Sequence, residues 1–301
     1  MSRWRKLGRI FLPAGQRPWM MSHAACPIAL HLENGRHRVY FGTRDAQNHP
    51  RVGFVEIDIE RPTEILAIAE QPALDLGAFG MFDENGVYPG TILAVGSQLR
   101  MYYCGRCNLD APRYAMAIGM AESSDGGLSF LRNQQSPILD RNATEPWAVS
   151  TPCVVPDGAG YRMWYLAGTG WNAAGDKSYY DIRQARSQDG VTWQRDGCPQ
   201  IPLGNGETNI ASPALLRQDE VWYMWYCTFI GGEYRLGHAR SSDGDVWIRC
   251  DAEAGISLSD SGWDSGGMAY PSIFTHKNRA YLLYSGNGYG RDGIGLAILE
   301  D

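Results

Sequence analysis

A short apolar segment that opens on proline occurs five times in this chain, and this repeat constrains the fold more than any other feature. Its prolines are Pro27, Pro89, Pro152, Pro213 and Pro271, so successive copies lie 62, 63, 61 and 58 residues apart. Each copy is followed by an aromatic-rich segment, namely VYFGTR, MYYCGR, MWYLAG, MWYCTF and LLYSGN. A period of this length indicates a repeat architecture, in which each unit buries its apolar face against its neighbour.

Three of the units continue with a third segment and a hairpin signal. The sequences are AESSDGGLSFLR, ARSQDGVTWQR and ARSSDGDVWIR. Asp-Gly between apolar runs predicts a strand, a tight turn and a fourth strand. Asp125, Asp189 and Asp243 in these turns are expected to accept backbone N–H bonds, as short acidic side chains commonly do in turns.

A four-stranded antiparallel unit repeated five times around an axis is a five-bladed β-propeller, which is an all-β fold. The last unit stops after a third strand, GIGLAILE. The segment WRKLGRIFL at 4–12 is expected to supply the missing outer strand. Pairing of the first and last segments would close the ring and remove an exposed edge. On this interpretation residues 1–301 form a single domain.

Composition excludes several classes of function. A net charge of −6 and a pI near 5.5 argue against a nucleic-acid partner. The chain contains no apolar run of about 18 residues, so no membrane span is expected. Seven cysteines without regular disulfide spacing favour a reducing, cytoplasmic setting. The single CxxC of Cys104 and Cys107 has no second pair, so we expect strand and loop residues there and no zinc site.

Four blades carry a carboxylate six or seven residues before the proline: Asp83, Glu145, Glu207 and Asp264. We call these four the register acids. The start of an innermost strand lies close to the axis, so the register acids are expected to ring one mouth of the central funnel. Like charges in a concave site push pKa values apart, which divides acid from base roles. They could also hold Ca²⁺ at the axis, or be ordinary solvated loop acids.

Other side chains of the predicted mouth suit an anionic sugar. Arg44 and Arg106 stand at equivalent positions of adjacent blades and could bind a carboxylate or phosphate. His23 could bind a hydroxyl or phosphate. The alternative is that the arginines pair with rim acids such as Asp45 or Asp83. Aromatic faces suit sugar rings. The remaining expected substrate contacts are Asp45, Trp171, Tyr180, Asp264, Tyr270 and Asn287.

Five blades, proline-led inner strands and a rim of carboxylates resemble the five-bladed glycoside hydrolase clan of families 43, 32, 62 and 130. The stretches SHAACP, GTRD, FDENGVYPG and GWDSGGMAYPS further resemble an uncharacterised family-43-like group whose members often accompany surface-polysaccharide biosynthesis. The resemblance covers the whole chain and implies catalytic acids directly before the inner-strand prolines. Here those positions hold Cys26, Tyr88, Thr151, Ser212 and Tyr270. The family's catalytic residues therefore do not transfer, and Cys26 is expected to be a packed core residue rather than a nucleophile.

We therefore expect a carbohydrate-active enzyme that acts on a glycosidic bond with an inverting pair of acids, roughly 6.5–9.5 Å apart. Glu207 would be the general acid. Asp83 would be the general base or a carboxylate that adjusts the pKa of the acid, and Glu145 could take either role. The substrate would be an anionic or phosphorylated sugar, and no cofactor is required. The alternatives are a phosphorylase or transferase of polysaccharide biosynthesis and a non-catalytic sugar-binding propeller. The sequence does not specify an oligomeric state.

Overall fold

The computed structural model describes residues 3–175 and 177–300. Most of these residues lie in β-strands. The first sheet contains β2 (Ser22–His31), β3 (Arg36–Arg44), β4 (Pro50–Asp58) and β5 (Arg61–Ile68). The second sheet contains β6 (Gly86–Val95), β7 (Gln98–Asn108), β8 (Tyr114–Ser123) and β9 (Leu131–Arg132).

The middle of the chain repeats the same antiparallel order twice. One unit contains β10 (Val149–Asp157), β11 (Gly160–Trp171), β12 (Ser178–Ser187) and β13 (Gln194–Arg195). The next contains β14 (Asn209–Gln218), β15 (Val221–Ile230), β16 (Glu233–Ser241) and β17 (Ile248–Arg249), followed by a short 3-10 helix, η1 (Asp251–Glu253). A parallel bridge between Tyr180 and Asn209 joins the two units into one eight-stranded sheet.

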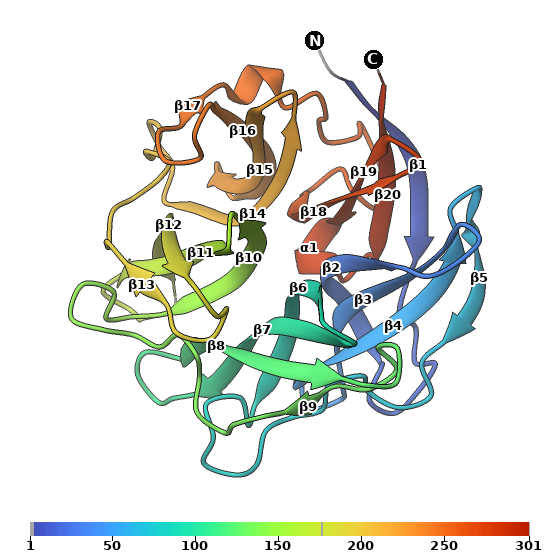
Figure 1. Ribbon diagram of the computed structural model, residues 1–301, viewed down its shortest axis with the longest axis horizontal. Helices are drawn as coiled ribbons and strands as arrows, with labels where there is room; N and C mark the ends of the chain where they lie inside the picture. The colour runs from blue at the N-terminus through green and yellow to red at the C-terminus, as the bar shows by residue number, and fades with distance from the viewer. Residues whose placement is uncertain (1–2, 176, 301) are drawn as a thin grey trace.

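The two ends of the chain share the last sheet. It contains β18 (Ala269–His276), β19 (Arg279–Ser285), β20 (Ile294–Glu300) and, next to β20, the N-terminal strand β1 (Arg3–Phe11). A short helix, α1 (Asn287–Gly290), connects β19 to β20. The expected pairing of the first and last segments is therefore confirmed. Figure 1 shows the two termini side by side.

The sheets are arranged around a common centre, as in a propeller (Figure 1). The strands nearest the centre are β2, β6, β10, β14 and β18, which we call the inner strands. Buried apolar side chains fill the space between neighbouring sheets. The predicted all-β, propeller-like arrangement of four-stranded antiparallel sheets is confirmed. Among the described helices none is long and apolar enough to cross a membrane.

Each inner strand has a register irregularity at or beside its proline. Proline has no N–H to donate to a ladder, so it is tolerated at the edge of a sheet or at a bulge. The residue before the proline has a positive φ in four of the strands: 52° at Cys26, 45° at Thr151, 55° at Ser212 and 54° at Tyr270. Such a bulge re-aims side chains, and all four residues line the central cavity.

The Asp-Gly turns have the structural role that the sequence indicates. The Asp189 carboxylate accepts the N–H groups of Val191 and Thr192, both at 2.8 Å. These bonds lower the pKa of Asp189 to about 2. The hydroxyl of Tyr102 in the second sheet donates to the Gly190 carbonyl of the same turn at 3.0 Å. The turn thus fastens one sheet to its neighbour.

Candidate functional site

The register acids are part of the sheet framework. Asp83 is 1% exposed. Its Oδ2 accepts the Tyr103 hydroxyl of β7 at 2.8 Å and the Arg132 Nε of β9 at 2.6 Å. Asp83 therefore ties the loop before an inner strand to the second and fourth strands of its own sheet.

The same arrangement recurs around the ring. Glu145 is fully buried and accepts the Tyr165 hydroxyl at 2.7 Å and Arg195 Nη1 at 2.5 Å. Asp264 is 2% exposed and accepts the Tyr284 hydroxyl at 3.1 Å and Lys6 Nζ at 2.7 Å. We call each set of acid, tyrosine and cation a clamp.

Glu207 is a variant of the clamp. It accepts the Thr228 hydroxyl and Arg249 Nη1, both at 2.6 Å, while Tyr226 donates to Asp251 instead. Burial alone would raise the pKa of Glu207, but the bonds from Arg249 and Thr228 outweigh it and hold the pKa below its usual value. A general acid needs a raised pKa, so this environment does not suit the expected role of Glu207.

The expectation that the register acids ring an open mouth is therefore wrong. Each side chain is turned into its own sheet, and each charge is already matched by a cation. The sequence contained a signal for this arrangement. An arginine ends each of the three hairpins, in FLR, WQR and WIR. These arginines are Arg132, Arg195 and Arg249, the clamp cations.

A different set of side chains gathers where the inner strands begin, and we call this region the mouth. Its members are His23, Arg44, Tyr88, Arg106, Tyr114, Trp171, Tyr180, Tyr234, Tyr270 and Tyr289. Their packing is close: a Cβ at Gly42 of β3 would lie 2.3 Å from the Tyr88 ring, so only glycine fits beside that tyrosine. Sequence reasoning singled out seven of these residues, with Tyr289 among them as an aromatic face for a sugar ring. It missed Tyr88 as a mouth residue, and also Tyr114 and Tyr234, because they resemble ordinary core aromatics.

The two arginines of the mouth remain available for an anion. Burial raises the pKa of Tyr88, and Arg44 and Arg106 both act in the opposite direction, so both guanidinium groups lie within electrostatic reach of one phenol. Arg106 lies over the Tyr114 ring at 5.2 Å, and its Nε has no hydrogen-bond partner among the described residues. Arg44 donates to Asn48 at 3.0 Å.

The alternative pairing of these arginines with rim acids is wrong. Asp45 pairs with Arg51 at 2.6 Å and Asp83 pairs with Arg132. Within residues 3–175 and 177–300, neither mouth arginine has a carboxylate in salt-bridge contact. Among the described residues, the two mouth arginines thus have no carboxylate counter-ion in direct contact.

His23 belongs to the mouth and is neutral at pH 7. Burial, and then the charges of Arg44 and Arg291, lower its pKa to about 4, while Asp292 opposes the shift. Its Nδ1 lies 2.9 Å from the Ser22 hydroxyl oxygen. His23 can therefore exchange hydrogen bonds with a ligand, while the arginines supply the charge.

The lowered pKa of His23 predicts an acid-sensitive contribution to stability. The unfolded chain binds a proton near pH 6.5 and the folded chain only near pH 4. Stability from this group is therefore complete above pH 6.5 and is lost as the pH falls towards 4. With allowance for the partly exposed ring, His23→Gln should remove about 1 kcal/mol of the difference in unfolding free energy between pH 7 and pH 5. Urea unfolding at both pH values measures this, and an unchanged pH dependence would contradict it.

Aromatic side chains form the rest of the mouth. Tyr114 meets Trp171 edge-on with ring centroids 4.9 Å apart, and Trp171 Nε1 has no hydrogen-bond partner in the described chain. The Tyr180 and Tyr234 hydroxyl groups share a hydrogen bond. Tyr289 packs on Tyr234 with ring centroids 5.7 Å apart and is 47% exposed. Sugar rings stack on faces of this kind while their hydroxyls bond to polar tips.

The base of the mouth contains Tyr270 and Cys26. Burial raises the pKa of both, so the Cys26 thiol is neutral at pH 7. A neutral thiol is neither a general base nor an activated nucleophile. Cys26 is half-buried and lines the central cavity, so its neutral thiol disfavours a nucleophile, but the residue is not fully packed in the core.

Two of the expected substrate contacts, Asp45 and Asn287, form hydrogen bonds to the backbone of nearby loops instead. Asp45 accepts the N–H groups of Gln47 and His49 at 2.9 Å each. The Asn287 side chain accepts the Gly266 N–H at 2.7 Å and donates to the Gly262 carbonyl at 2.9 Å. Both side chains hold local backbone in place, so few of their bonds remain for a ligand.

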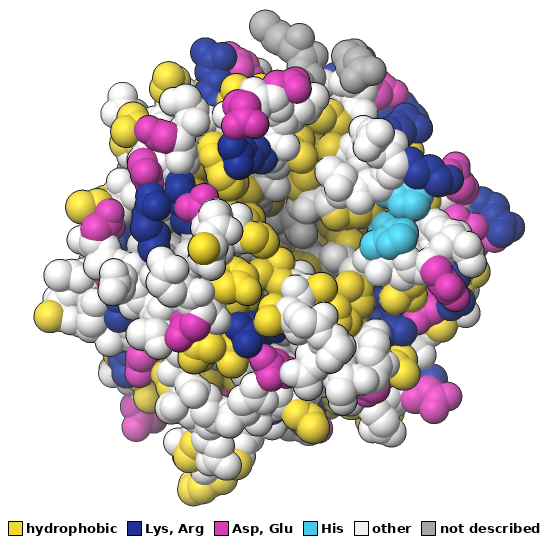
Figure 2. All heavy atoms as spheres, viewed as in Figure 1, with side chains coloured by type: hydrophobic (Ala, Val, Ile, Leu, Met, Phe, Trp, Pro, Cys, Tyr) yellow, Lys and Arg dark blue, Asp and Glu magenta, His cyan; other side chains and the backbone are white. Residues whose placement is uncertain are grey.

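Beyond the base of the mouth lies a central cavity of about 300 Å³, lined by the inner-strand prolines and the residues around them. The face in Figure 2 is hollowed at its centre, with apolar side chains around the hollow. The described lining residues are apolar or carry hydroxyl or thiol groups, and none is a carboxylate. Ca²⁺ prefers several carboxylate or carbonyl oxygens. The residues present therefore do not fit the expected Ca²⁺ at the axis.

Comparison with solved structures defines the class of fold. The protein superposes on a glycoside hydrolase with a TM-score of 0.76 over 97% of this chain and 90% of the other, at 18% identity. A thermostable family-43 glycoside hydrolase gives a TM-score of 0.67 over 95% and 90%, at 17% identity. The fold is thus the propeller of family-43-like glycoside hydrolases.

Sequence relatives define the family. No family model matches the chain. The uncharacterised proteins MT1551 and Rv1502 of two Mycobacterium tuberculosis strains are each 39% identical to it over 299 residues, which is 99% of this chain and 99% of theirs. The chain belongs to the family that includes these proteins.

Proposed function

We propose that this protein binds an anionic carbohydrate at the mouth, through Arg44 and Arg106 for the acid group and the surrounding aromatics for the sugar ring. The observation that carries the proposal is the absence of a carboxylate partner for either arginine among the described residues. A guanidinium fork matches the geometry of a carboxylate or phosphate. Among the described residues, Arg106 Nε and Trp171 Nε1 are buried without a hydrogen-bond partner, so a small local movement would be needed for either to donate to a ligand.

Catalysis on a glycosidic bond is the second candidate, supported by the fold shared with glycoside hydrolases. Inverting hydrolysis needs one protonated and one ionised carboxyl group on opposite sides of the bond. Asp83, Glu145 and Glu207 are held in clamps, which disfavours hydrolysis by that pair mechanism. Phosphorolysis or transfer fits the mouth better, because an anion held by two arginines could then be the reacting group.

The binding proposal is tested by Arg44→Gln and Arg106→Gln. Each variant should weaken binding of a uronic acid or sugar phosphate at least about tenfold, because a charge-assisted hydrogen bond contributes about 1.5–3 kcal/mol. Affinity should also fall with added salt, and less steeply in the variants. Calorimetry on a panel of neutral sugars, uronic acids and sugar phosphates measures both effects.

The matched control is Arg61→Gln, an arginine on β5 whose side chain is 62% exposed. It should bind like the unmodified protein. Equal affinity for neutral and anionic sugars, or wild-type affinity in both mouth variants, would contradict the proposal. Turnover of any glycoside or sugar phosphate in the same panel would decide between binding alone and catalysis.

We also propose that the five sheet units form one five-bladed domain spanning residues 1–301.

The described cysteines are all unpaired, which supports a reducing compartment such as the cytoplasm.

A further inference from the structure

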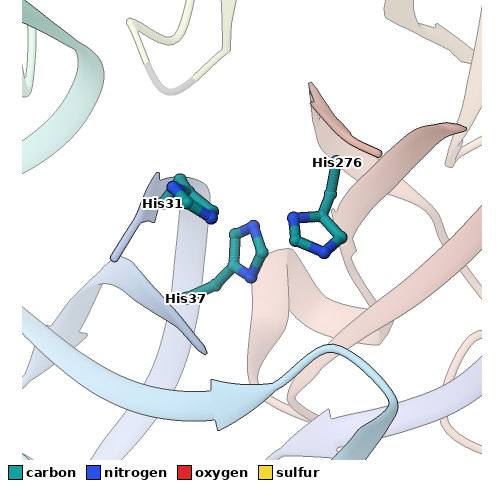
Figure 3. A group of neighbouring side chains, drawn as sticks. All are labelled: His31, His37 and His276. Atoms are coloured by element: carbon teal, nitrogen blue, oxygen red, sulfur yellow. The ribbon is translucent and has the colours of Figure 1, made fainter. Parts of the chain in front are cut away.

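Three histidines meet at the opposite end of the inner strands from the mouth. His31 ends β2 and faces His37 of β3 across their hairpin. His276 ends β18 in the neighbouring sheet. The ring centroids form a nearly equilateral triangle with sides of 5.1, 5.4 and 5.0 Å. Figure 3 shows the three rings turned towards one another across the junction between the first and last sheets.

The ring nitrogens are placed like metal ligands. One nitrogen from each histidine lies within 4.8 Å of the other two. His37 is fully buried and His276 is 9% exposed, and Nε2 of each has no hydrogen-bond partner among the residues described. Buried polar groups are nearly always satisfied, so two orphan imidazole nitrogens in one cluster require a reason.

A backbone bond orients the central ring. His37 Nδ1 lies 3.1 Å from the Gly35 carbonyl oxygen. A carbonyl only accepts, so Nδ1 carries the proton and the Nε2 lone pair is free for a metal. Such a second hydrogen bond on a ligating histidine is the usual way in which a protein fixes the tautomer.

We propose that His31, His37 and His276 form a three-histidine site for a divalent first-row metal, with zinc as the best fit. Three nitrogen donors with a fourth position open suit tetrahedral zinc. Because His31 is exposed, the fourth position faces solvent and would hold water. A bound ion would link β2 and β3 to β18 and so fasten the junction at which the ring closes.

The geometry needs only a small adjustment. Nitrogens on one tetrahedral zinc lie roughly 3.3 Å apart, given Zn–N bonds of about 2.0–2.1 Å. The ligand atoms here are within 4.8 Å of one another. The remaining gap can be closed by side-chain rotations, for which the exposed His31 has the most freedom.

The test uses the full chain, stripped with a chelator and titrated with zinc chloride in a non-coordinating buffer. Calorimetry should give one zinc per chain. The melting temperature should rise with zinc concentration, because an ion that binds only the folded state stabilises it. Cobalt substituted for zinc should give the intense visible absorption of a tetrahedral site.

Variants locate the ion. His31→Ala should keep the fold, because the side chain is exposed, and should lower zinc affinity at least about tenfold. His276→Gln should do the same and serves as the second variant. His49→Ala, which removes a histidine outside the cluster, should bind zinc like the unmodified protein.

Two results would overturn the proposal. The first is no stoichiometric zinc binding, which would leave a metal-free imidazole cluster. The second is binding that survives His31→Ala and is lost in Cys250→Ala. That result would place the ion at His238, Cys250 and Glu253, the second group of neighbouring donor side chains in the described chain. Neither result depends on whether the mouth binds a sugar.

Discussion

Replacement of Glu145 with alanine is expected to lower the free energy of unfolding by about 3–5 kcal/mol. Glu145 is fully buried, and its carboxylate matches the charge of Arg195, a side chain that is only 15% exposed. Removal of the carboxylate leaves that guanidinium in a poorly solvated site without its partner. The Tyr165 hydroxyl also loses its acceptor. Urea unfolding, monitored by tryptophan fluorescence, measures the change.

Two controls separate a clamp from a catalytic group. Glu145→Met combined with Arg195→Met should be much less destabilising than the single change, because a buried ion pair can often be replaced by apolar side chains at little cost. Glu220→Ala removes an acid whose side chain is 89% exposed and should change stability by less than about 0.5 kcal/mol. If Glu145→Ala kept wild-type stability and lost only an activity on sugars, the clamp interpretation would be wrong.

The shared repeat position of the register acids could be read from the sequence, but the orientation of their side chains could not. Equivalent positions in five repeats identified Asp83, Glu145, Glu207 and Asp264 as one structural set. Whether such side chains point towards the axis or into the sheet depends on what the sheet offers them. Here a hydroxyl group of the second strand, from tyrosine in three sheets and from Thr228 in the fourth, and a cation of the outermost strand offer better partners than water.

The mouth and the histidine cluster were harder to foresee for a different reason. Arg44 and Arg106 share a repeat position, so comparison of blades found them. Tyr88 shares the position before the proline with Tyr270, but that position does not say which space a side chain faces, and Tyr234 has no distinctive spacing. Only packing shows that both tyrosines lie near the arginines. His276 approaches His31 only because the ring closes. No local pattern in the sequence encodes that contact.

The N-terminal strand was predictable because the last repeat lacks a fourth segment, and its removal gives the second large expected effect. Deletion of the first twelve residues should abolish cooperative unfolding and cause aggregation. β1 pairs with β20 from Arg3 opposite Glu300 to Phe11 opposite Ile294. Without it, β20 becomes an exposed edge that can pair with other chains.

The buried side chains of β1 determine how much stability the deletion removes. Trp4, Ile10 and Phe11 are 3%, 4% and 6% exposed. Truncation of a single buried large side chain costs about 2–5 kcal/mol. Loss of all three therefore approaches or exceeds the whole stability of a typical domain, about 5–15 kcal/mol.

A point variant and an added peptide measure how much β1 contributes to stability. Trp4 packs edge-on against Trp225 of the neighbouring sheet with centroids 5.4 Å apart, so Trp4→Ala alone should cost about 3–5 kcal/mol. A synthetic peptide of residues 1–13, added to the truncated chain during refolding, should restore a cooperative melt, because the edge it pairs with is otherwise free. A truncated chain that melted like the full chain would show that β1 only covers a ring already stable without it. The closure of the propeller would then have to come from the contacts of β2 with β18, β19 and α1.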